Sequence, residues 1–473
     1  MTASAEVAEG VAAERSTTGR IVDKVGTYRF GTLPGDVVEV AKHCLLDWLG
    51  VALAGSREPV ARILLDEVLD QGGKPLATVV GHPQRVAPTQ AALVNGAAAH
   101  ALDYDDVLRT MHGHPSAPVA AAALAVAEQR GATGAGLLTA FVAGVEAAAA
   151  VGRTVEPGHH EAGWHATSTL GTFGAAAAAA HLMTLERPQW LAAFGLAGTQ
   201  AAGLKAVFGT MGKPFHAGRA ALGGVLAARL AARGATSGTD IVGAPQGFGA
   251  AATPEYRPDA LPATFDEDFD IRQVLFKRHA ACHLTHSAVE AMLALRASHG
   301  VRATDVARIT LTLRPVHLTT CCIDTVTTPL EGKFSVRFAT ALALVRGSAG
   351  ERDFVPETVA DPEIARVARL IDIEVADENG PAGDTVTPVA VRLTDGTVLH
   401  ERVDVGQPCP PESHDAQAEL LTNKFVSLAE PVIGERHTAE AAEAVRHLED
   451  LDDLGPLMEL VRGRTGTEPH SSR

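Results

Sequence analysis

The chain has 473 residues, of which 46% are hydrophobic but only 4% are aromatic. Single hydrophobic cores stop growing near roughly 250–300 residues, so two domains are expected, with alanine, leucine and valine filling most of the interior. The formal net charge of -16 argues against a nucleic-acid partner, and an acidic chain that binds an acidic metabolite must concentrate its cations locally.

The start of the chain, residues 1–20, lacks the basic-then-apolar pattern of a signal peptide and is predicted to be a disordered lead. Glycine, proline and polar residues interrupt the alanine-rich runs, which predicts no contact with a membrane. The chain has five cysteines and no CxxC pair, a pattern that indicates a reducing, cytoplasmic compartment.

The first half is predicted to be almost wholly helical, because its apolar residues recur at helical spacing. Pro88 and Pro115 suit first helical turns, and Gly131 suits a stop. Only a short extended piece is expected, at 78–80. No GxGxxG or Walker sequence follows a strand, so nucleotide binding has little support. The predicted helices cover residues 35–53, 59–69, 88–102, 115–129, 134–152, 167–184, 188–207 and 214–234.

A stretch rich in Gly, Pro and Asp, about 243–268, marks a domain boundary. Beyond it the patterns mix: Ile309, Leu311 and Leu313 share one face of a predicted strand, and Asp395-Gly396 is a strong hairpin signal between two extended runs. The predicted helices here are 286–298 and 334–346, and the predicted strands are 308–314, 389–393 and 398–405.

Helices return from Asp415 and are expected to rejoin the first domain. The predicted fold is therefore mainly α, with a large all-helical domain formed by both ends of the chain and a smaller α+β domain. The predicted boundaries are 1–20 for the lead, 21–268 for the first helical part, 269–408 for the α+β domain, and 409–473 for the C-terminal helices and a polar tail.

The stretch from His100 to Ser116 contains Asp103, Asp105 and Asp106 between two alanine-rich helices, together with two histidines. Carboxylates are poorly placed at a helix C-terminus, where the macrodipole already presents negative charge. An ordinary solvated loop could carry them, but the long apolar flanks favour a functional site.

Three more polar clusters resemble one another in their placement: His159 to Thr167, Gly209 to Arg219, and Lys277 to His286. Lys213 precedes Pro214, which opens a helix, and His216 and Arg219 can share one face of that helix. His114 and His165 also precede helices. Free N–H groups and the positive dipole end make helix starts suitable for anions, so several starts aimed at one cavity would suit a polycarboxylate.

These residue types are suited to acid–base chemistry. Histidine has an ordinary pKa of about 6.5 and can carry or accept a proton near neutral pH. Lys213, with other cations, could stabilise an enolate-like dianion, and no covalent nucleophile is needed. Adjacent Cys321 and Cys322 lack an evident activating partner, which favours a structural role.

A divalent metal is the main competing hypothesis, because Asp-Tyr-Asp-Asp and His-Gly-His in the 100–116 stretch offer oxygen and imidazole donors. No HExxH or well-spaced Cys/His set accompanies them. We therefore expect no metal at this site. Activity that survives a strong chelator would remove the metal hypothesis.

The four clusters carry a resemblance to a known family. Ala-Leu-Asp-Tyr-Asp-Asp followed by His-Pro-Ser, Gly-Trp-His-Ala-Thr, Gly-Thr-Met-Gly-Lys-Pro-Phe-His-Ala-Gly and Gly332-Lys-Phe-Ser-Val resemble motifs of the MmgE/PrpD family. That family includes 2-methylcitrate dehydratases, cis-aconitate decarboxylases and iminodisuccinate epimerases. The resemblance spans roughly Ile21 to Leu460. It implies a helical domain made from both chain ends, an α+β lid, a homodimer and no required cofactor.

The resemblance also implies site residues. Asp103, His114, His165 and Lys213 match polar residues of the family's cleft. His216 and Arg219 follow in the same motif as Lys213, and the expected substrate-binding set is completed by Lys277, His283 and His286. Two departures stand out. Val107 replaces a threonine, and Cys282 stands where the decarboxylases place a histidine, for which His283 is a candidate substitute.

The leading hypothesis from the sequence is a cofactor-independent lyase of 2-methylcitrate dehydratase type, acting on a small di- or tricarboxylate. Lys213, His216 and Arg219 would stabilise negative charge, His114 and His165 would transfer protons, and Asp103 would orient them. The same groups could run a decarboxylation or an epimerisation, and a noncatalytic helical scaffold is the alternative from another class. Pocket shape, which decides the substrate's side group, is not visible in sequence.

Overall fold

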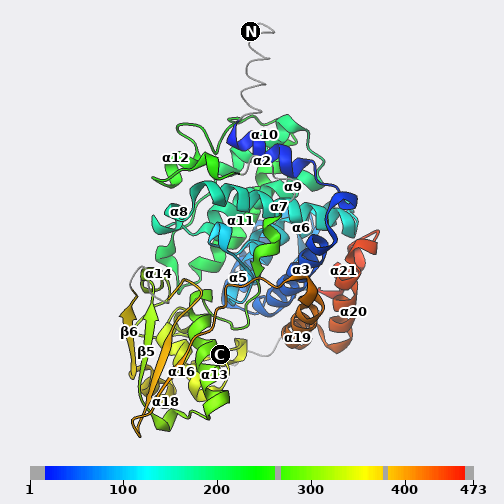
Figure 1. Ribbon diagram of the computed structural model, residues 1–473. Helices are drawn as coiled ribbons and strands as arrows, with labels where there is room; N and C mark the ends of the chain where they lie inside the picture. Colours follow the sequence, from blue (N-terminus) through cyan, green and yellow to red (C-terminus); the bar gives the residue numbers. More distant parts are fainter. Residues whose placement is uncertain (1–15, 262–267, 377–381, 464–473) are drawn as a thin grey trace.

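The computed structural model describes residues 16–261, 268–376 and 382–463, and the chain is mainly α-helical (Figure 1). Its buried apolar residues form two clusters. The larger cluster joins residues from Ile21 to Val274 with residues from Leu421 to Val461, and the smaller one covers residues from Ala280 to Val391. The polar tail predicted at the end of the chain lies largely outside the described residues.

The larger core lies among helices that follow one another along the first half of the chain. They are α2 (Thr17–Gly26), α3 (Gly35–Gly55), α4 (Pro59–Gln71), α5 (Pro88–Ala101), α6 (Ser116–Arg130), α7 (Gly134–Val155), α8 (Gly158–Glu161), α9 (Ala166–Leu182), α10 (Arg187–Gly198), α11 (Gly212–Ala231) and α12 (Phe248–Ala252). Two small antiparallel pairs accompany them, β1 (Ala77–Thr78) with β2 (Arg85–Val86) and β3 (Val107–Leu108) with β4 (Val274–Leu275).

Small residues let these helices pack closely, and one contact matters for the site. A Cβ atom added to Gly218 of α11 would lie only 2.1 Å from the carbonyl oxygen of Leu93 in α5. Gly96 in turn lies against Gly218. Only glycine permits this approach. It brings the end of α5 beside the start of α11.

Helix α7 corrects one expectation. Its glycines do not interrupt it, and it is the one helix in the described parts of the chain that is long and apolar enough to cross a membrane. Most of it is buried inside the protein, as 89% of its most apolar window is covered. Such burial is typical of the central helix of a protein core.

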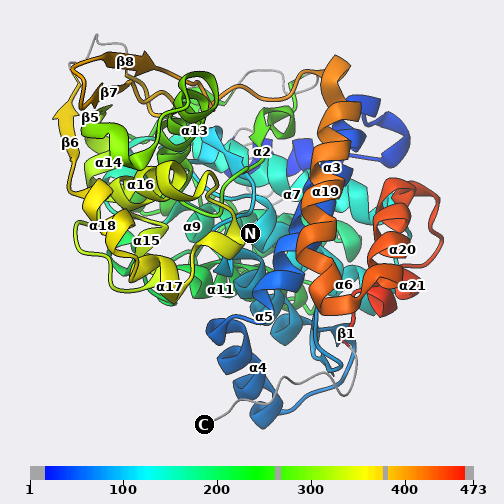
Figure 2. The same ribbon diagram turned by 90° about the horizontal axis from the view of Figure 1, so that it is seen from below.

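The last helices return to the first ones. They are α19 (His414–Ile433), α20 (Glu435–Arg446) and α21 (Gly455–Leu460). In both views α19 lies alongside α3, with α20 and α21 beyond it (Figures 1 and 2). Phe425 of α19 contacts Gly50 of α3, so residues 375 positions apart share one core.

The smaller core lies in a mixed region that projects from the helical body (Figure 1). Its helices are α13 (His283–His299), α14 (Pro315–Thr320), α15 (Pro329–Gly332), α16 (Val336–Arg346), α17 (Pro356–Val359) and α18 (Pro362–Ala368). Its strands β5 (Val306–Leu313), β6 (Ile371–Val375), β7 (Val389–Leu393) and β8 (Val398–Glu401) form one sheet in the order β6-β5-β7-β8.

The predicted strand at 308–314 and the hairpin are confirmed, as β7 and β8 pair antiparallel and Gly396 has a φ of 93° in the turn. Strand β6, which runs parallel to β5, was not predicted. Its sequence Ile-Asp-Ile-Glu-Val alternates apolar and polar residues, so the strand signal was present and was missed, although only Ile371 is buried. The predicted strand at 398–405 is too long, because β8 ends at Glu401.

Two boundaries near the helical body were also wrong. Residues 17–20 belong to α2 rather than to a disordered lead, because the Ser16 hydroxyl caps that helix by accepting from the N–H of Gly19. Helix α10 ends at Gly198 rather than continuing to 207. The chain then turns through Gly203, at φ 139°, whose carbonyl accepts from the N–H of His165.

Candidate active site

Asp103 occupies a strained position immediately after α5. Its φ of 50° lies in the left-handed region, which Asp tolerates better than most residues but which still costs energy. Three lysines hold the chain there by binding successive carbonyl oxygens: Lys333 Nζ to Leu102 at 2.6 Å, Lys277 Nζ to Asp103 at 2.7 Å, and Lys424 Nζ to Tyr104 at 2.8 Å. Cations suit the negative end of a helix, so this arrangement stabilises the end of α5.

The side chain of Asp103 is itself held between two lysines. Its Oδ1 accepts from Lys213 Nζ at 2.6 Å and from Lys277 Nζ at 2.9 Å. Burial alone would raise the pKa of Asp103, but the charges of the two lysines outweigh it and hold that pKa well below its usual value. Asp103 is therefore ionised, and it balances two buried cations.

Lys213 lies in the first turn of α11, where the helix dipole disfavours a cation. Asp103 compensates for that placement. The ammonium group also lies 5.2 Å from the ring centre of Phe208 and 4.8 Å from that of Phe334, both within cation–π range. Lys213 is thus fixed in an apolar, largely water-excluded position.

Asp105 forms a second ionic group beside the first. Its carboxylate lies 2.8 Å from His100 Nδ1 and 3.3 Å from His114 Nδ1. Burial opposes ionisation, yet these two histidines hold the pKa of Asp105 well below its ordinary value. Burial also lowers the pKa of His100 to about 4 and lowers that of His114. Near neutral pH the histidines are neutral, and Asp105 orients them.

Asp106 has a different role, consistent with shaping the turn. It accepts hydrogen bonds from the backbone N–H and the hydroxyl of Ser116, the first residue of α6. Burial raises its pKa to about 7. Asp106 therefore closes the start of α6, and among these three carboxylates Asp103 and Asp105 face the histidines and lysines.

Four helix starts meet at one cavity of about 120 Å³. Gly113 and His114 precede α6, His165 is the N-cap residue of α9, Lys213 lies in the first turn of α11, and His283 begins α13. All five residues line the cavity, as do Phe208 and Phe334. Unpaired N–H groups at helix starts attract anions, and since Asp106 already binds the start of α6, the starts of α9, α11 and α13 remain for a ligand. The mixed region contributes Cys282, Val316 and Thr320 to the opposite wall.

His165 links the cavity to a second histidine. Its Nδ1 lies 3.1 Å from Nδ1 of His216 on α11, while its buried Nε2 has no hydrogen-bond partner among the described residues. Burial, with His100 and Lys213 nearby, holds the pKa of His165 well below its ordinary value. Asp103 Oδ2 and His100 Nε2 are likewise buried without a partner. Such buried polar atoms are costly unless a ligand or water bonds them.

The donors for a metal ion are present but engaged. His100, Asp103, Asp105 and His114 offer atoms that all lie within 4.8 Å of one another. However, two ammonium groups already bind Asp103 Oδ1, and His100 Nδ1 and His114 Nδ1 face Asp105. A dication there would have to displace the lysines or suffer their repulsion. The chemistry of the donor set therefore favours lysine as the local source of positive charge.

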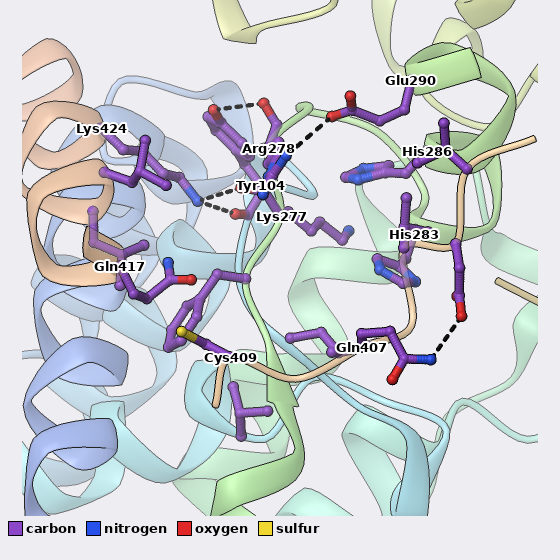
Figure 3. Close-up of a pocket in the computed structure, with 18 residues that line it drawn as sticks. Tyr104, Lys277, Arg278, His283, His286, Glu290, Gln407, Cys409, Gln417 and Lys424 are labelled. Carbon is purple, nitrogen blue, oxygen red and sulfur yellow. Dashed lines mark hydrogen bonds and ion pairs between the residues drawn. The ribbon is translucent and has the colours of Figure 1, made fainter. Parts of the chain in front are cut away.

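A larger cavity of about 580 Å³ lies on the far side of Lys277, between α19, α13 and the connector that follows β8 (Figure 3). Its principal cation is already engaged, since Lys424 Nζ binds the carbonyls of Tyr104 and Lys277 and pairs with Asp47. Lys277 turns its ammonium toward Asp103. The smaller cavity, where polar atoms remain without partners, is the better candidate for chemistry.

The predicted residues thus fall into three sets. Asp103, His114, His165, Lys213, Lys277 and His283 lie at or directly beside the small cavity. His216 lies behind His165, and His286 lines only the larger cavity, with its Nε2 bonded to the carbonyl of Ala281 at 3.2 Å. Arg219 lies apart: its Nη1 lies against Gly223, further along α11, where a Cβ atom added to that glycine would be 3.1 Å away, and Arg219 lines neither cavity.

The sequence did not single out His100 and Asp105, although both belong to the 100–116 stretch. A carboxylate five residues after a helical histidine was the available signal. Phe208 and Phe334, which flank Lys213, gave no signal of their own, because an isolated phenylalanine in an apolar sequence is usually core.

Models of the MmgE/PrpD N-terminal domain and the MmgE/PrpD C-terminal domain match residues 19–260 and 279–450. The chain belongs to the MmgE/PrpD family. It is similar to the cis-aconitate decarboxylases of Homo sapiens, at 28% identity over 97% of both chains, and of Mus musculus, at 29% identity over 95% of this chain and 94% of that protein. Cis-aconitate decarboxylase of Aspergillus terreus is 25% identical over 95% of this chain and 96% of its own length. These relatives are lyases.

Proposed function

We propose that this protein is a lyase that decarboxylates a small, unsaturated tricarboxylate of the cis-aconitate type. One observation carries the proposal: four helix starts and the Lys213 ammonium converge on one small cavity. The names of the relatives favour decarboxylation over the dehydration expected from sequence. A cavity of about 120 Å³ also suits a small acid rather than a nucleotide or a coenzyme conjugate.

Substrate carboxylates would bind at the helix starts and beside Lys213. Asp103 is the one hydrogen-bond acceptor of Lys213 among the described residues, and Lys213 also lines the cavity. The rings of Phe208 and Phe334 keep this surface apolar. Such surroundings strengthen each ionic contact and weaken the solvation of a carboxylate that is to leave as neutral CO₂.

In the chemical step the bond between the substrate carbon and its carboxylate breaks, and the electron pair stays on carbon. That charge spreads into an adjacent carboxylate as an enolate-like dianion. Lys213 would stabilise it, with Lys277 supporting Asp103 from behind. The dianion then takes up one proton, so the reaction consumes one proton and releases one CO₂.

His165 and His114 are the proposed proton carriers. Both are neutral in the empty site, because burial lowers their pKa. A bound polyanion adds negative charge beside them, which raises the pKa of an imidazole and favours its protonated form. The unpartnered Nε2 of His165 is the atom best placed to give a proton to the substrate.

Dehydration is the second candidate, and one observation favours it. Histidines held neutral are suited to take a proton from carbon, which is how a dehydratase or an epimerase begins. In that case the dianion would form by loss of a proton instead of loss of CO₂, and it would then expel a hydroxyl group. The same residues serve both reactions.

We also propose that the mixed region around the smaller core acts as a lid over the cavity, since it supplies Cys282, His283 and Thr320 to one wall. The family resemblance further supports a homodimer. Light scattering coupled to gel filtration should then give twice the chain mass of 49.0 kDa. A mass of one chain would contradict the dimer.

The function is tested by incubating the protein with cis-aconitate, citrate-like hydroxy acids and iminodisuccinate, followed by mass spectrometry of the products. Loss of CO₂ from the unsaturated tricarboxylate is the expected outcome. Loss of water would support the dehydratase, and an inverted centre at unchanged mass would support an epimerase. No change with any acid would contradict a lyase acting on these substrates.

A further inference from the structure

Histidines at the candidate site extend beyond the cavity wall. His165 lines the cavity, whereas His216 does not. The two rings nevertheless meet, because their Nδ1 atoms lie 3.1 Å apart. His216 is half-buried on the first turns of α11, beside the exposed Phe215 and Met211. One face of this pair therefore meets the cavity and the other approaches solvent.

The ring nitrogens of His165 and His216 are arranged so that a proton can pass from His216 to His165. A contact between two Nδ1 atoms requires one to donate and the other to accept. If Nδ1 of His216 donates, His165 carries its own proton on Nε2, which is the buried atom without a partner. Hydrogen bonds also fix the backbone of both histidines: the N–H of His165 donates to the carbonyl of Gly203, and Ser168 Oγ donates to the carbonyl of His216.

We propose that His216 relays protons from solvent to His165 during turnover. This inference rests on the proposed decarboxylation, which consumes one proton in each cycle. His165 gives its Nε2 proton to the substrate carbon, its Nδ1 receives the Nδ1 proton of His216, and His216 is reprotonated at Nε2 by water. The net transfer is one proton from solvent to product, without any oxidant or reductant. Exchange with water after product release restores the starting tautomers.

His216 was expected from sequence to bind substrate, and the relay gives it a different role. Because His216 does not line the cavity, it would not contact a substrate bound there. A side chain that acts through His165 should change the rate of turnover and leave substrate binding intact. A substrate-binding residue should instead change KM.

The test is His216→Gln, in which the amide can still bond to His165 Nδ1 but cannot carry a proton through a ring. We expect kcat for CO₂ release from cis-aconitate to fall about 10- to 100-fold, with KM nearly unchanged. Added imidazole should restore kcat in proportion to its concentration. Wild-type turnover should be insensitive to imidazole.

His181→Gln is the matched control, because His181 lies at the far end of α9, the helix that His165 caps, and its one hydrogen bond within the described part of the chain is to the carbonyl of Tyr28. It should have wild-type kcat and no response to imidazole. Unchanged kcat in His216→Gln, or a loss that imidazole does not repair, would overturn the relay while leaving the decarboxylation intact. A wild-type protein that releases no CO₂ would overturn the proposed function and the relay with it.

Discussion

Two buried lysine–aspartate pairs in this protein have the same geometry and different surroundings. Lys213 Nζ lies 2.6 Å from Asp103, and Lys424 Nζ lies 2.6 Å from Asp47. Lys424 also donates hydrogen bonds to the carbonyls of Tyr104 and Lys277, so its ammonium group already has three oxygen neighbours from the protein. Lys213 has only Asp103 as a hydrogen-bond acceptor among the described residues, and its remaining neighbours are aromatic rings and a cavity.

The difference separates a lysine that holds the fold from a lysine that is available to a ligand. A buried ion pair is by itself weak evidence for function, because structural networks produce the same distances and the same shifted pKa values. What distinguishes Lys213 is unused hydrogen-bonding capacity facing a space that a small acid could fill. Substituting both lysines in the same way should therefore give opposite results.

The largest expected effect is on turnover in Lys213→Met, which keeps the side-chain volume and removes the charge. We expect kcat to fall by roughly 10³-fold or more, because the developing dianion loses its main cation. Circular dichroism should show a folded protein. Retention of most of the activity would contradict the role of Lys213.

A second test concerns the proton carrier. His165→Gln should lower kcat by about 10²- to 10⁴-fold, the usual range for loss of a general acid or base. His159→Gln provides a comparison within the same sequence cluster, since His159 bonds to Thr169 and to the carbonyl of Ala252 away from the cavity. It should retain turnover measured per folded molecule. An equal loss of kcat in His165→Gln and His159→Gln would contradict the assignment of His165 as the proton carrier.

Lys424→Met should act on stability instead of chemistry. Removing one member of a buried ion pair typically costs about 3–5 kcal/mol, because the remaining charge is left without its partner. Burial already raises the pKa of Asp47, and that shift should grow without Lys424. Urea unfolding would measure the loss. A stable variant with abolished turnover would mean that Lys424, too, belongs to the reaction.

A smaller effect should appear in the pH dependence of stability, for which His159 is a suitable probe. Burial lowers its pKa from 6.5 to about 4, so the folded state binds fewer protons than the unfolded state between these values. Its contribution is present above pH 6.5 and declines as the pH falls toward 4, by on the order of 3 kcal/mol. Unfolding free energies measured across this window should fall less steeply in His159→Gln. An unchanged slope would contradict the assignment.

The smallest expected effect is that of a chelator. Because lysines already occupy the position of a cation at Asp103, turnover should be unchanged after prolonged treatment with EDTA. The check is kcat before and after chelation, with zinc and magnesium added back separately. Loss of activity that one metal restores would support the competing metal hypothesis for the His100 and Asp105 group.

The helices and the strand at 308–314 were predictable because their apolar periodicity is strong. Strand β6 was missed although its apolar residues alternate with two acidic ones, so the signal for it was available. The end of α10 was not predictable, because it is fixed by a contact between Gly203 and His165 that lies far outside any local window. Local sequence carries little information about where a chain must turn to meet a distant segment.

The site divides in the same way. Motifs predicted that Asp103, His114, His165 and Lys213 would belong together, and the structure places them at or beside one cavity. Where the Arg219 side chain would lie could not be predicted. Helical spacing shows which residues lie on the same face of a helix, but it does not show which part of the protein packs against that face. The three lysines that hold the end of α5 come from positions 277, 333 and 424, and their common target appears only once the chain is folded.

In the proposed reaction, the small cavity built around Lys213 decarboxylates an unsaturated tricarboxylate. This reaction is measured as CO₂ release from cis-aconitate by the wild-type protein, Lys213→Met and Lys424→Met, each normalised to its folded fraction. We expect stoichiometric CO₂ from the wild type, near-wild-type release per folded molecule from Lys424→Met, and almost none from Lys213→Met. Release that survives in Lys213→Met, or a wild-type product that has lost water instead of CO₂, would contradict the proposed reaction.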